Sequence, residues 1–359
     1  MDRSPITGPP RPTAPAPSDN VLVGVAGWSY PDWHGCFYPA KRQSLPELAL
    51  VCRTFDCAEI NVSFYRIPEA RMAEHWLRAV AWKPGFLFTS KVPKELTHEK
   101  DIDATGIGAA GADLKEGLRP LIDAGRLAAF LLQFPFHFCD GPESRDRIRR
   151  LLEALQPVPV AVEVRHRSFY FGPLRSSATE QSPLYTGPGN ALHFLEKLGA
   201  AFVNIDLPPG AGSVPPTSIN TSPLGYVRLH GRNARAWFDP KATRDEKYDY
   251  RYGPEELAQW KERILKLAAR TGRTFVIANN HFKAQAPANA IELMHLLGRT
   301  PAQVPREIIQ AFPELGRLVR PAEAVAVEKS ILDLPGVSVD PSDQENPVPP
   351  LPRKKGGRR

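Results

Sequence analysis

Apolar residues gather along this chain in eight short runs, and each run ends in polar or charged side chains. The runs cover residues 21–26, 57–60, 86–90, 128–132, 158–162, 201–205, 226–229 and 274–278. Continuous apolar runs of this length are typical of strands buried on both faces, as they are in a parallel sheet. The pattern therefore predicts eight buried strands whose carboxyl ends carry polar groups.

Helical patterns separate the runs, at residues 44–54, 69–80, 112–124, 143–155, 191–198, 254–269 and 288–297. Ser44 and Glu47 have capping-box spacing at the start of the first helix. Strands that alternate with helices predict parallel strands joined by crossover helices. Eight such units over about 280 residues match a single-domain α/β fold, the TIM (β/α)8 barrel. The alternative is a doubly wound open sheet, but residues 27–30 lack its glycine-rich nucleotide turn.

The predicted organisation has four parts. Residues 1–20 form a disordered Pro-rich leader, residues 21–300 the barrel, residues 301–332 a helical extension, and residues 333–359 a disordered tail that is first Pro-rich and then basic. Two connections, 171–190 and 206–225, are long and Pro-rich. The second starts at the predicted working face, where a loop of that length would form a lid.

The chain has 359 residues and a net charge of +7. Acidic and basic residues nearly cancel in the predicted tail, so most of the positive charge belongs to the folded part. A basic surface suits an anionic partner, either a small anionic substrate or a nucleic acid attracted by the basic tail. We expect no membrane partner, because no apolar run is long enough to span a bilayer.

The four cysteines are scattered and form no CxxC pair, which favours a reducing, cytoplasmic location.

Ionisable side chains at the strand ends are the candidate catalytic residues: Glu59, Lys91, Glu163, Asp206 and His230. Catalysis in TIM barrels takes place at the carboxyl ends of the strands, where these residues would meet. Glu163 or His230 would act as general acid or base. Structural alternatives stay open: Glu59 could form an ion pair with Lys91 or an arginine, Glu163 and Arg165 could form a pair that braces the barrel mouth, and Asp206 could be a turn residue.

Arginines at the same strand ends are the candidate anion-binding residues. Arg165 shares a strand face with Glu163, and Arg228 shares one with His230. Loops after the seventh and eighth strands of TIM barrels often hold phosphate, so Arg228 and Arg232 predict an anion site. The remaining predicted binding residues are aromatic and amide side chains, which could equally plug the barrel end or satisfy turns: Trp28, Tyr30, Tyr65, Asn61, Asn279 and Asn280.

No cofactor is predicted. A divalent metal is the minority alternative, because the carboxylates and His230 could converge on one ion. Against it, the chain has no HxH or HxxxH pair, and Lys91, Arg165 and Arg228 would compete for the same carboxylates.

Several ordered motifs over about residues 22–298 resemble the DUF72 (YecE-like) family. They are Gly27-Trp28-Ser29-Tyr30 with Trp33, Phe37-Tyr38-Pro39, Glu59-Ile60-Asn61 with Phe64-Tyr65, Trp76, Phe86, Lys91, Gln133-Phe134-Pro135, Glu163-Val164-Arg165-His166, Asp206, Arg228-Leu229-His230-Gly231 and Asn279-Asn280. The resemblance implies a TIM barrel and supplies no mechanism. The insert 171–190 departs from the shorter stretch expected there.

Three functions are compatible with these patterns. The first is an enzyme with hydrolase-like acid/base chemistry on an anionic, phosphorylated or sugar-like substrate at the barrel mouth. The second is a non-catalytic nucleic-acid or anion binder. The third is a scaffold without chemistry, which charges buried at several strand ends argue against, since unpaired they would cost stability.

Overall fold

The computed structural model describes residues 18–41, 46–99, 102–171, 189–209, 213–301, 303–319 and 324–325. The predicted tail, most of the predicted leader, Ser44 and residues 172–188 of the predicted insert lie outside these ranges. No helix in the described ranges is both long and apolar enough to cross a membrane.

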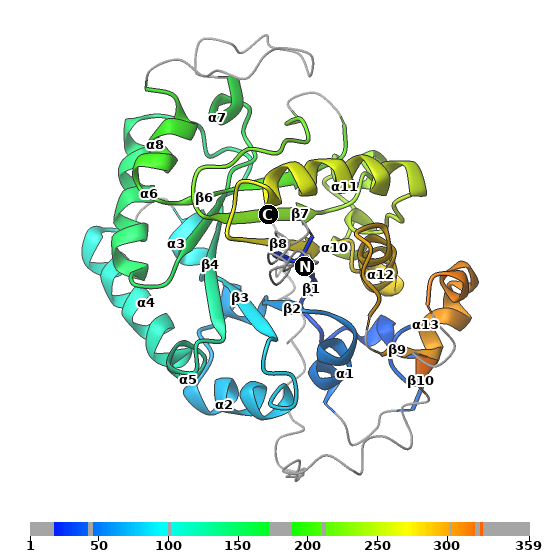
Figure 1. The fold of residues 1–359 in the computed structure, drawn as a ribbon. Coiled ribbons are helices and arrows are strands. Elements are labelled where there is room, and N and C mark those ends of the chain that lie inside the picture. The colour runs from blue at the N-terminus through cyan, green and yellow to red at the C-terminus, as the bar shows by residue number, and fades with distance from the viewer. Residues whose placement is uncertain are drawn as a thin grey trace, which may run out of the picture.

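Eight parallel strands close into a barrel in which each strand pairs with its neighbours in chain order (Figure 1). They are β1 Val21–Ala26, β2 Cys57–Ile60, β3 Leu87–Lys91, β4 Leu127–Gln133, β5 Val160–Glu163, β6 Ala201–Asp206, β7 Leu224–Leu229 and β8 Arg273–Ala278. β8 closes the barrel against β1, in register from Val21 opposite Thr274 to Val25 opposite Ala278. The predicted TIM barrel is therefore confirmed.

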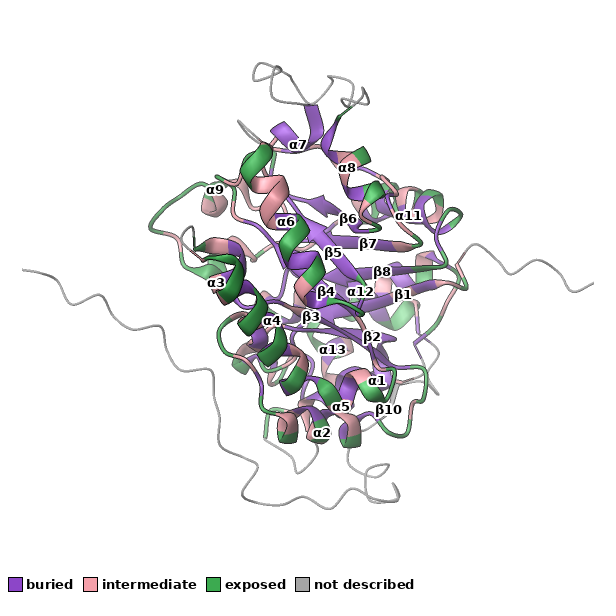
Figure 2. Ribbon diagram, turned by 90° about the vertical axis from the view of Figure 1, so that its left-hand side faces the viewer, coloured by how far each residue is buried: buried purple, intermediate pink, exposed green. Residues whose placement is uncertain are grey.

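Helices surround the barrel, and Figure 2 shows the strands buried inside while α2, α4 and α6 turn exposed faces outward. The helices are α1 Glu47–Thr54, α2 Ala70–Ala79, α3 Lys94–His98, α4 Ala104–Gly117, α5 Arg119–Asp123, α6 Pro142–Leu155, α7 Ser168–Phe171, α8 Ala191–Lys197, α9 Ala234–Trp237, α10 Arg244–Lys247, α11 Pro254–Ala268, α12 Gln285–Leu296 and α13 Arg306–Ala311. Short 3₁₀ turns are η1 Pro31–Trp33, η2 Val62–Phe64, η3 Phe282–Ala284 and η4 Pro313–Arg317. α6 buries Ile148, Leu151 and Leu155, the three-and-four spacing of an amphipathic helix.

One predicted helix, 112–124, has the wrong bounds. The structure has α4 from Ala104, where the Asp103 carboxylate caps the helix by accepting from the Gly106 N–H at 2.7 Å. A second helix, α5, begins after Leu118, because Pro120 has no N–H to continue the hydrogen-bond ladder. The Ala- and Gly-rich start of α4 carries little apolar periodicity, which hid its true beginning from the sequence pattern.

The C-terminal extension is only partly helical. α13 and η4 are flanked by β9 Val304–Pro305 and β10 Ala324–Val325, which pair as a two-stranded parallel sheet. Residues 326–332 of the predicted extension lie outside the described ranges.

The described part of the 206–225 connection packs along the outside of β6, so the predicted lid is wrong. Asn204 of β6 accepts from the Thr217 hydroxyl and the Ile219 N–H, both at 2.7 Å. The Thr221 hydroxyl donates to the Ala200 carbonyl at 2.6 Å, at the start of β6. The connection therefore runs back toward the amino end of the strand, away from the barrel mouth.

Candidate functional site

Side chains from several strands meet inside the barrel, because alternate residues of each strand point inward. The Tyr226 hydroxyl of β7 lies 2.8 Å from the Thr89 hydroxyl of β3. It also donates to Glu59 of β2 at 3.0 Å. These contacts cross the barrel and fix which face of β2, β3 and β7 is internal.

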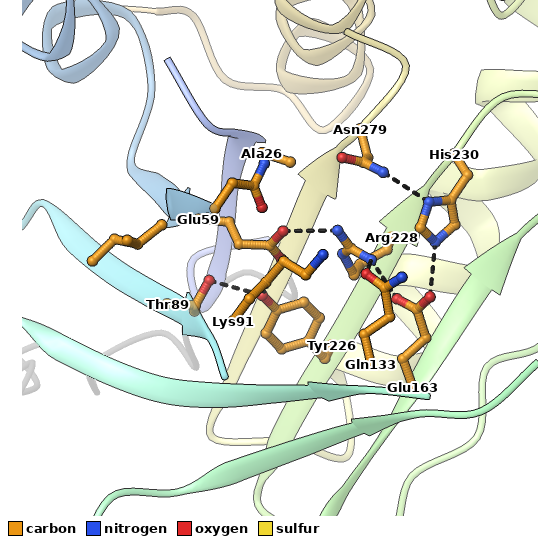
Figure 3. Close-up of polar contacts among 12 residues, drawn as sticks. Ala26, Glu59, Thr89, Lys91, Gln133, Glu163, Tyr226, Arg228, His230 and Asn279 are labelled. Atoms are coloured by element: carbon orange, nitrogen blue, oxygen red, sulfur yellow. Dashed lines mark hydrogen bonds and ion pairs between the residues drawn. The ribbon is translucent and has the colours of Figure 1, made fainter. Parts of the chain in front are cut away.

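Arg228, two residues after Tyr226, lies at the centre of the polar interior. Its Nη2 donates to Glu59 at 2.7 Å, and its Nη1 donates to Glu163 at 2.5 Å and to Gln133 at 3.2 Å. Figure 3 shows the two carboxylates approaching the guanidinium from different strands. Glu59 and Glu163 are 0% exposed and Arg228 is 1% exposed. We call Glu59, Arg228 and Glu163 the central cluster.

Opposite charges keep Arg228 and Glu163 ionised in spite of their burial. Burial alone would raise the pKa of Glu163, but the positive charges of Arg228 and Arg165 outweigh it and hold that pKa well below its usual range. Burial disfavours charged Arg228 too, yet Glu163 and Glu59 raise its pKa above the ordinary value. Arg228 and Glu163 therefore form a fixed ion pair at neutral pH.

Two more side chains hold Glu163. Arg165 places both Nε and Nη2 2.7 Å from Oε1 of Glu163, and His230 Nε2 lies 3.3 Å from the same oxygen. The other imidazole nitrogen of His230, Nδ1, lies 2.8 Å from the Asn279 amide nitrogen. Burial lowers the pKa of His230 to about 3, so its imidazole is neutral at pH 7. Glu163 and Asn279 together fix the orientation of the ring, one at each nitrogen.

Lys91, at the end of β3, is partly exposed and lies beside the central cluster. Its ammonium lies 3.7 Å from the centre of the Phe64 ring and, within the described residues, has no hydrogen-bond or ion-pair partner. Burial of the side chain and the charge of Arg228 lower the pKa of Lys91 to about 7, against the opposing pull of Glu59 and Glu163. Lys91 is therefore the group beside the cluster that changes charge near neutrality.

An aromatic wall flanks the ionic groups. Tyr30 stacks on His281 with centroids 4.7 Å apart, Tyr248 lies 5.0 Å from His281, and Trp237 lies 5.6 Å from Tyr248. The Arg165 guanidinium carbon is 5.9 Å from the Trp237 ring. Trp237 and Tyr248 are partly exposed, so a ring of a bound molecule can reach them.

Asp206 and Arg232 do not join the central cluster. Asp206 and Phe202 are four residues apart on β6, so their side chains point to the same face of the strand. Phe202 packs on Tyr170 of α7, outside the barrel, and Asp206 therefore points outward as well. Arg232 Nε donates to both Asp206 oxygens, at 2.9 and 3.1 Å, and its Nη1 donates to Glu256 of α11 at 2.9 Å. We call Asp206, Arg232 and Glu256 the outer cluster. Its position corrects the expectation that all the strand-end charges share one site.

Tyr252 completes the outer cluster. Its hydroxyl accepts from the Gly231 N–H at 2.8 Å and also bonds to Asp206. Gly231 has a φ of +93°, and a Cβ there would lie 2.8 Å from the Tyr250 Cβ, so glycine is required for the turn and its packing. Tyr252 thereby occupies the Gly231 N–H, which is not free to bind an anion.

The other predicted binding residues divide between the mouth and the surrounding packing. The Asn61 amide nitrogen lies 3.5 Å from the Tyr30 hydroxyl, and Tyr65 is 46% exposed. Trp28 instead packs edge-on against Trp76 of α2, at 5.5 Å. The Asn280 amide nitrogen donates to the Tyr250 carbonyl and to Asn289 of α12, at 2.8 and 2.9 Å. Asn280 is thereby committed to holding the loop after β8.

Sequence reasoning missed several side chains that the fold brings to this region. Gln133 contacts Arg228, and its position as the polar end of the fourth apolar run was a usable signal. Tyr226 lies two residues before Arg228, so alternation along the strand could have placed both side chains on the same face. Trp237 and Tyr248 come from the long connection after β7, which has no strand or helix pattern that would place them.

The metal alternative depends on carboxylates and histidines that converge. Among the residues that the structure describes, no three His, Cys, Asp or Glu side chains are grouped so that they could hold a metal ion. Asp206 lies in the outer cluster, and the oxygens of Glu59 and Glu163 face arginines.

Known proteins match nearly the whole barrel. A family described as "Protein of unknown function DUF72" matches residues 22–314. UPF0759 protein YunF of Bacillus subtilis (strain 168) is 30% identical over 284 residues, which are 77% of this chain and 94% of that protein. UPF0759 protein YecE of Escherichia coli (strain K12) is 25% identical over 151 residues, 42% of this chain and 50% of that protein.

Solved structures agree with this match. The crystal structure of a DUF72 family protein from Thermotoga maritima MSB8 has 31% sequence identity and a TM-score of 0.64, covering 78% of this chain and 99% of that chain. One from Enterococcus faecalis V583 has 23% identity and the same TM-score, covering 78% of this chain and 96% of that chain, and it shows the shared fold. The chain belongs to the DUF72 family of TIM-barrel proteins.

Proposed function

We propose that this chain is an enzyme that performs acid/base chemistry on a small anionic substrate, phosphorylated or sugar-like, at the carboxyl-end mouth of the barrel. One observation carries the proposal: Lys91 and Arg165, both partly exposed, lie at the same mouth beside the buried central cluster. The central cluster by itself would only brace the barrel, and its one arginine faces two carboxylates, so Arg165 offsets the second of them. Two accessible cations beside it supply a place for an anion.

The roles follow from what each group can do. Two nitrogens of the Arg165 guanidinium lie against Glu163, so Arg165 is positioned to bind an anion with the remaining one. Lys91, with its pKa lowered to about 7 by burial and by Arg228, can take up or release a proton at neutral pH. In this proposal the proton-transfer role moves from Glu163 and His230 to Lys91, because the first two are fixed in single charge states.

The test uses purified protein with 4-nitrophenyl phosphate and 4-nitrophenyl glycosides as hydrolysis probes, and inorganic phosphate as the binding probe. Lys91→Arg keeps a positive charge but cannot release its proton near pH 7. We expect it to lower turnover by about 100-fold while phosphate affinity measured by calorimetry stays within about twofold. Lys94→Arg on α3, an exposed position nearby, is the matched control and should change neither. Equal turnover in the parent and Lys91→Arg would overturn the role of Lys91, and absence of both phosphate binding and hydrolysis would overturn the proposal.

A further inference from the structure

Lys91 differs from the other cations beside the central cluster because no carboxylate holds its end group. Arg228 and Arg165 each contact a carboxylate oxygen at 2.7 Å or less. Within the described residues, Glu59 and Glu163 lie outside ion-pair distance of the Lys91 ammonium, which instead lies 3.7 Å from the centre of the Phe64 ring. Figure 3 shows the side chain reaching inward from β3 toward Arg228 and Gln133.

The surroundings of Lys91 favour the neutral amine. The charged and titratable groups that act on it are Arg228 of β7, Glu59 of β2, and Glu163 and Arg165 at the end of β5. His98 of α3 also lies nearby, and burial together with the Lys91 charge lowers the pKa of His98 to about 4, so it adds no positive charge at neutral pH. A lysine that is desolvated and placed next to another cation is activated as a nucleophile, since its nitrogen lone pair is free.

We propose that Lys91 is a covalent nucleophile that forms an imine with a small aldehyde or ketone carrying a phosphate or carboxylate. The inference rests on the proposed function for the location of the mouth and for Arg165 as the anion-binding group. It goes further by naming the substrate class and the bond that forms. The anion would bind Arg165, while the carbonyl carbon meets the Lys91 nitrogen.

The chemistry balances without a cofactor. The Lys91 lone pair attacks the carbonyl carbon, and the carbonyl π electrons move to oxygen, which takes a proton. The nitrogen gives up its proton and the carbinolamine loses water, leaving a C=N bond that is protonated as an iminium. In the test below, cyanoborohydride supplies a hydride to that carbon, which reduces the imine to a stable secondary amine.

Trapping with glycolaldehyde phosphate and sodium cyanoborohydride tests the inference on the intact chain, with peptide mapping by mass spectrometry as the readout. We expect Lys91 to be modified on the order of tenfold or more faster than the exposed Lys94 in the same sample, because an ordinary lysine is almost fully protonated at pH 7. Its labelling should rise with pH through about 7. Uncharged glycolaldehyde, which lacks the anion, should label Lys91 more slowly.

Other outcomes overturn the inference. Labelling of Lys91 no faster than Lys94, or equal rates with glycolaldehyde and glycolaldehyde phosphate, would show that no such site exists. Lys91→Arg should lose the adduct and Lys94→Arg should keep it. The parent-protein comparison of the two lysines stands even if a variant folds poorly. Failed trapping with intact phosphate binding and hydrolysis would reject the imine alone, whereas loss of phosphate binding as well would reject the proposed function.

Discussion

Two acid–arginine clusters at strand ends of the same barrel look alike in the sequence and differ in what lies around them. The central cluster is enclosed by strands, with Glu59, Arg228 and Glu163 almost fully buried. In the outer cluster, Arg232 keeps 22% of its side chain exposed and is tied to Asp206 and to Glu256 of α11. The first joins strands across the barrel, whereas the second fastens a helix to its outside.

The difference shows that a charge at a strand end does not by itself mark a site. Each outer-cluster acid is held by a neighbouring arginine or tyrosine, and Tyr250 also donates to Glu256 at 2.8 Å. The central cluster instead borders Lys91, whose ammonium lacks a carboxylate partner among the described residues. An unpaired, partly exposed cation beside buried charges that are paired with one another is the feature that favours chemistry.

The largest expected effect is a difference in the free energy of unfolding between variants of the two clusters. Arg228→Met leaves two buried carboxylates without their shared partner, which should lower the free energy of unfolding by about 3–5 kcal/mol. Arg232→Met, the matched change in the outer cluster, should cost about 1–2 kcal/mol, because water can partly replace a partly exposed arginine. Urea unfolding of both variants measures the difference. Equal losses would mean that the central cluster is no more enclosed than the outer one.

A smaller effect is expected on phosphate affinity, which should differ between a variant at the mouth and a variant in the outer cluster. Arg165→Met should weaken inorganic phosphate binding by about tenfold, because the guanidinium at the mouth supplies a charge-assisted hydrogen bond. Arg232→Met should leave phosphate affinity unchanged, since Arg232 is committed to Asp206 and Glu256. Calorimetric titration of both variants checks the comparison. If the outer variant loses affinity and the mouth variant does not, the anion site lies on the other side of β7.

The sequence predicted that Glu59, Glu163 and Arg228 would meet because they stand at or near the ends of predicted strands, and the carboxyl ends of parallel strands lie together at one end of a barrel. Alternation added that Arg228 shares a strand face with His230. The same rule could not place Asp206, because both faces of β6 are buried and its Asn204 is polar, so nothing in the run says which face is internal. Trp237 and Tyr248 depend on how a long connection folds over the mouth, and no sequence period encodes that.

The smallest expected effect concerns the stability contribution of Lys91 and its dependence on pH. Its folded pKa of about 7 lies below its ordinary value of 10.5, so the folded chain binds fewer protons than the unfolded chain between these values. Stability should therefore fall as pH drops from 10.5 through 7, and Lys91→Met should remove that slope. Partial exposure and the Phe64 contact limit the effect to on the order of 1 kcal/mol.

The comparison is made as a difference between two pH values, which cancels any gain or loss from packing a methionine at that position. Urea unfolding is measured at pH 6 and pH 10. The free energy of unfolding of Lys91→Met relative to that of the parent should be higher at pH 6 than at pH 10. No outer-cluster change should reproduce this, because Arg232 stays charged throughout that range. A variant that instead loses stability at pH 6 would show that Lys91 is held by a carboxylate in solution. Lys91 would then be a bracing residue like Arg232, and the contrast between the two clusters would disappear.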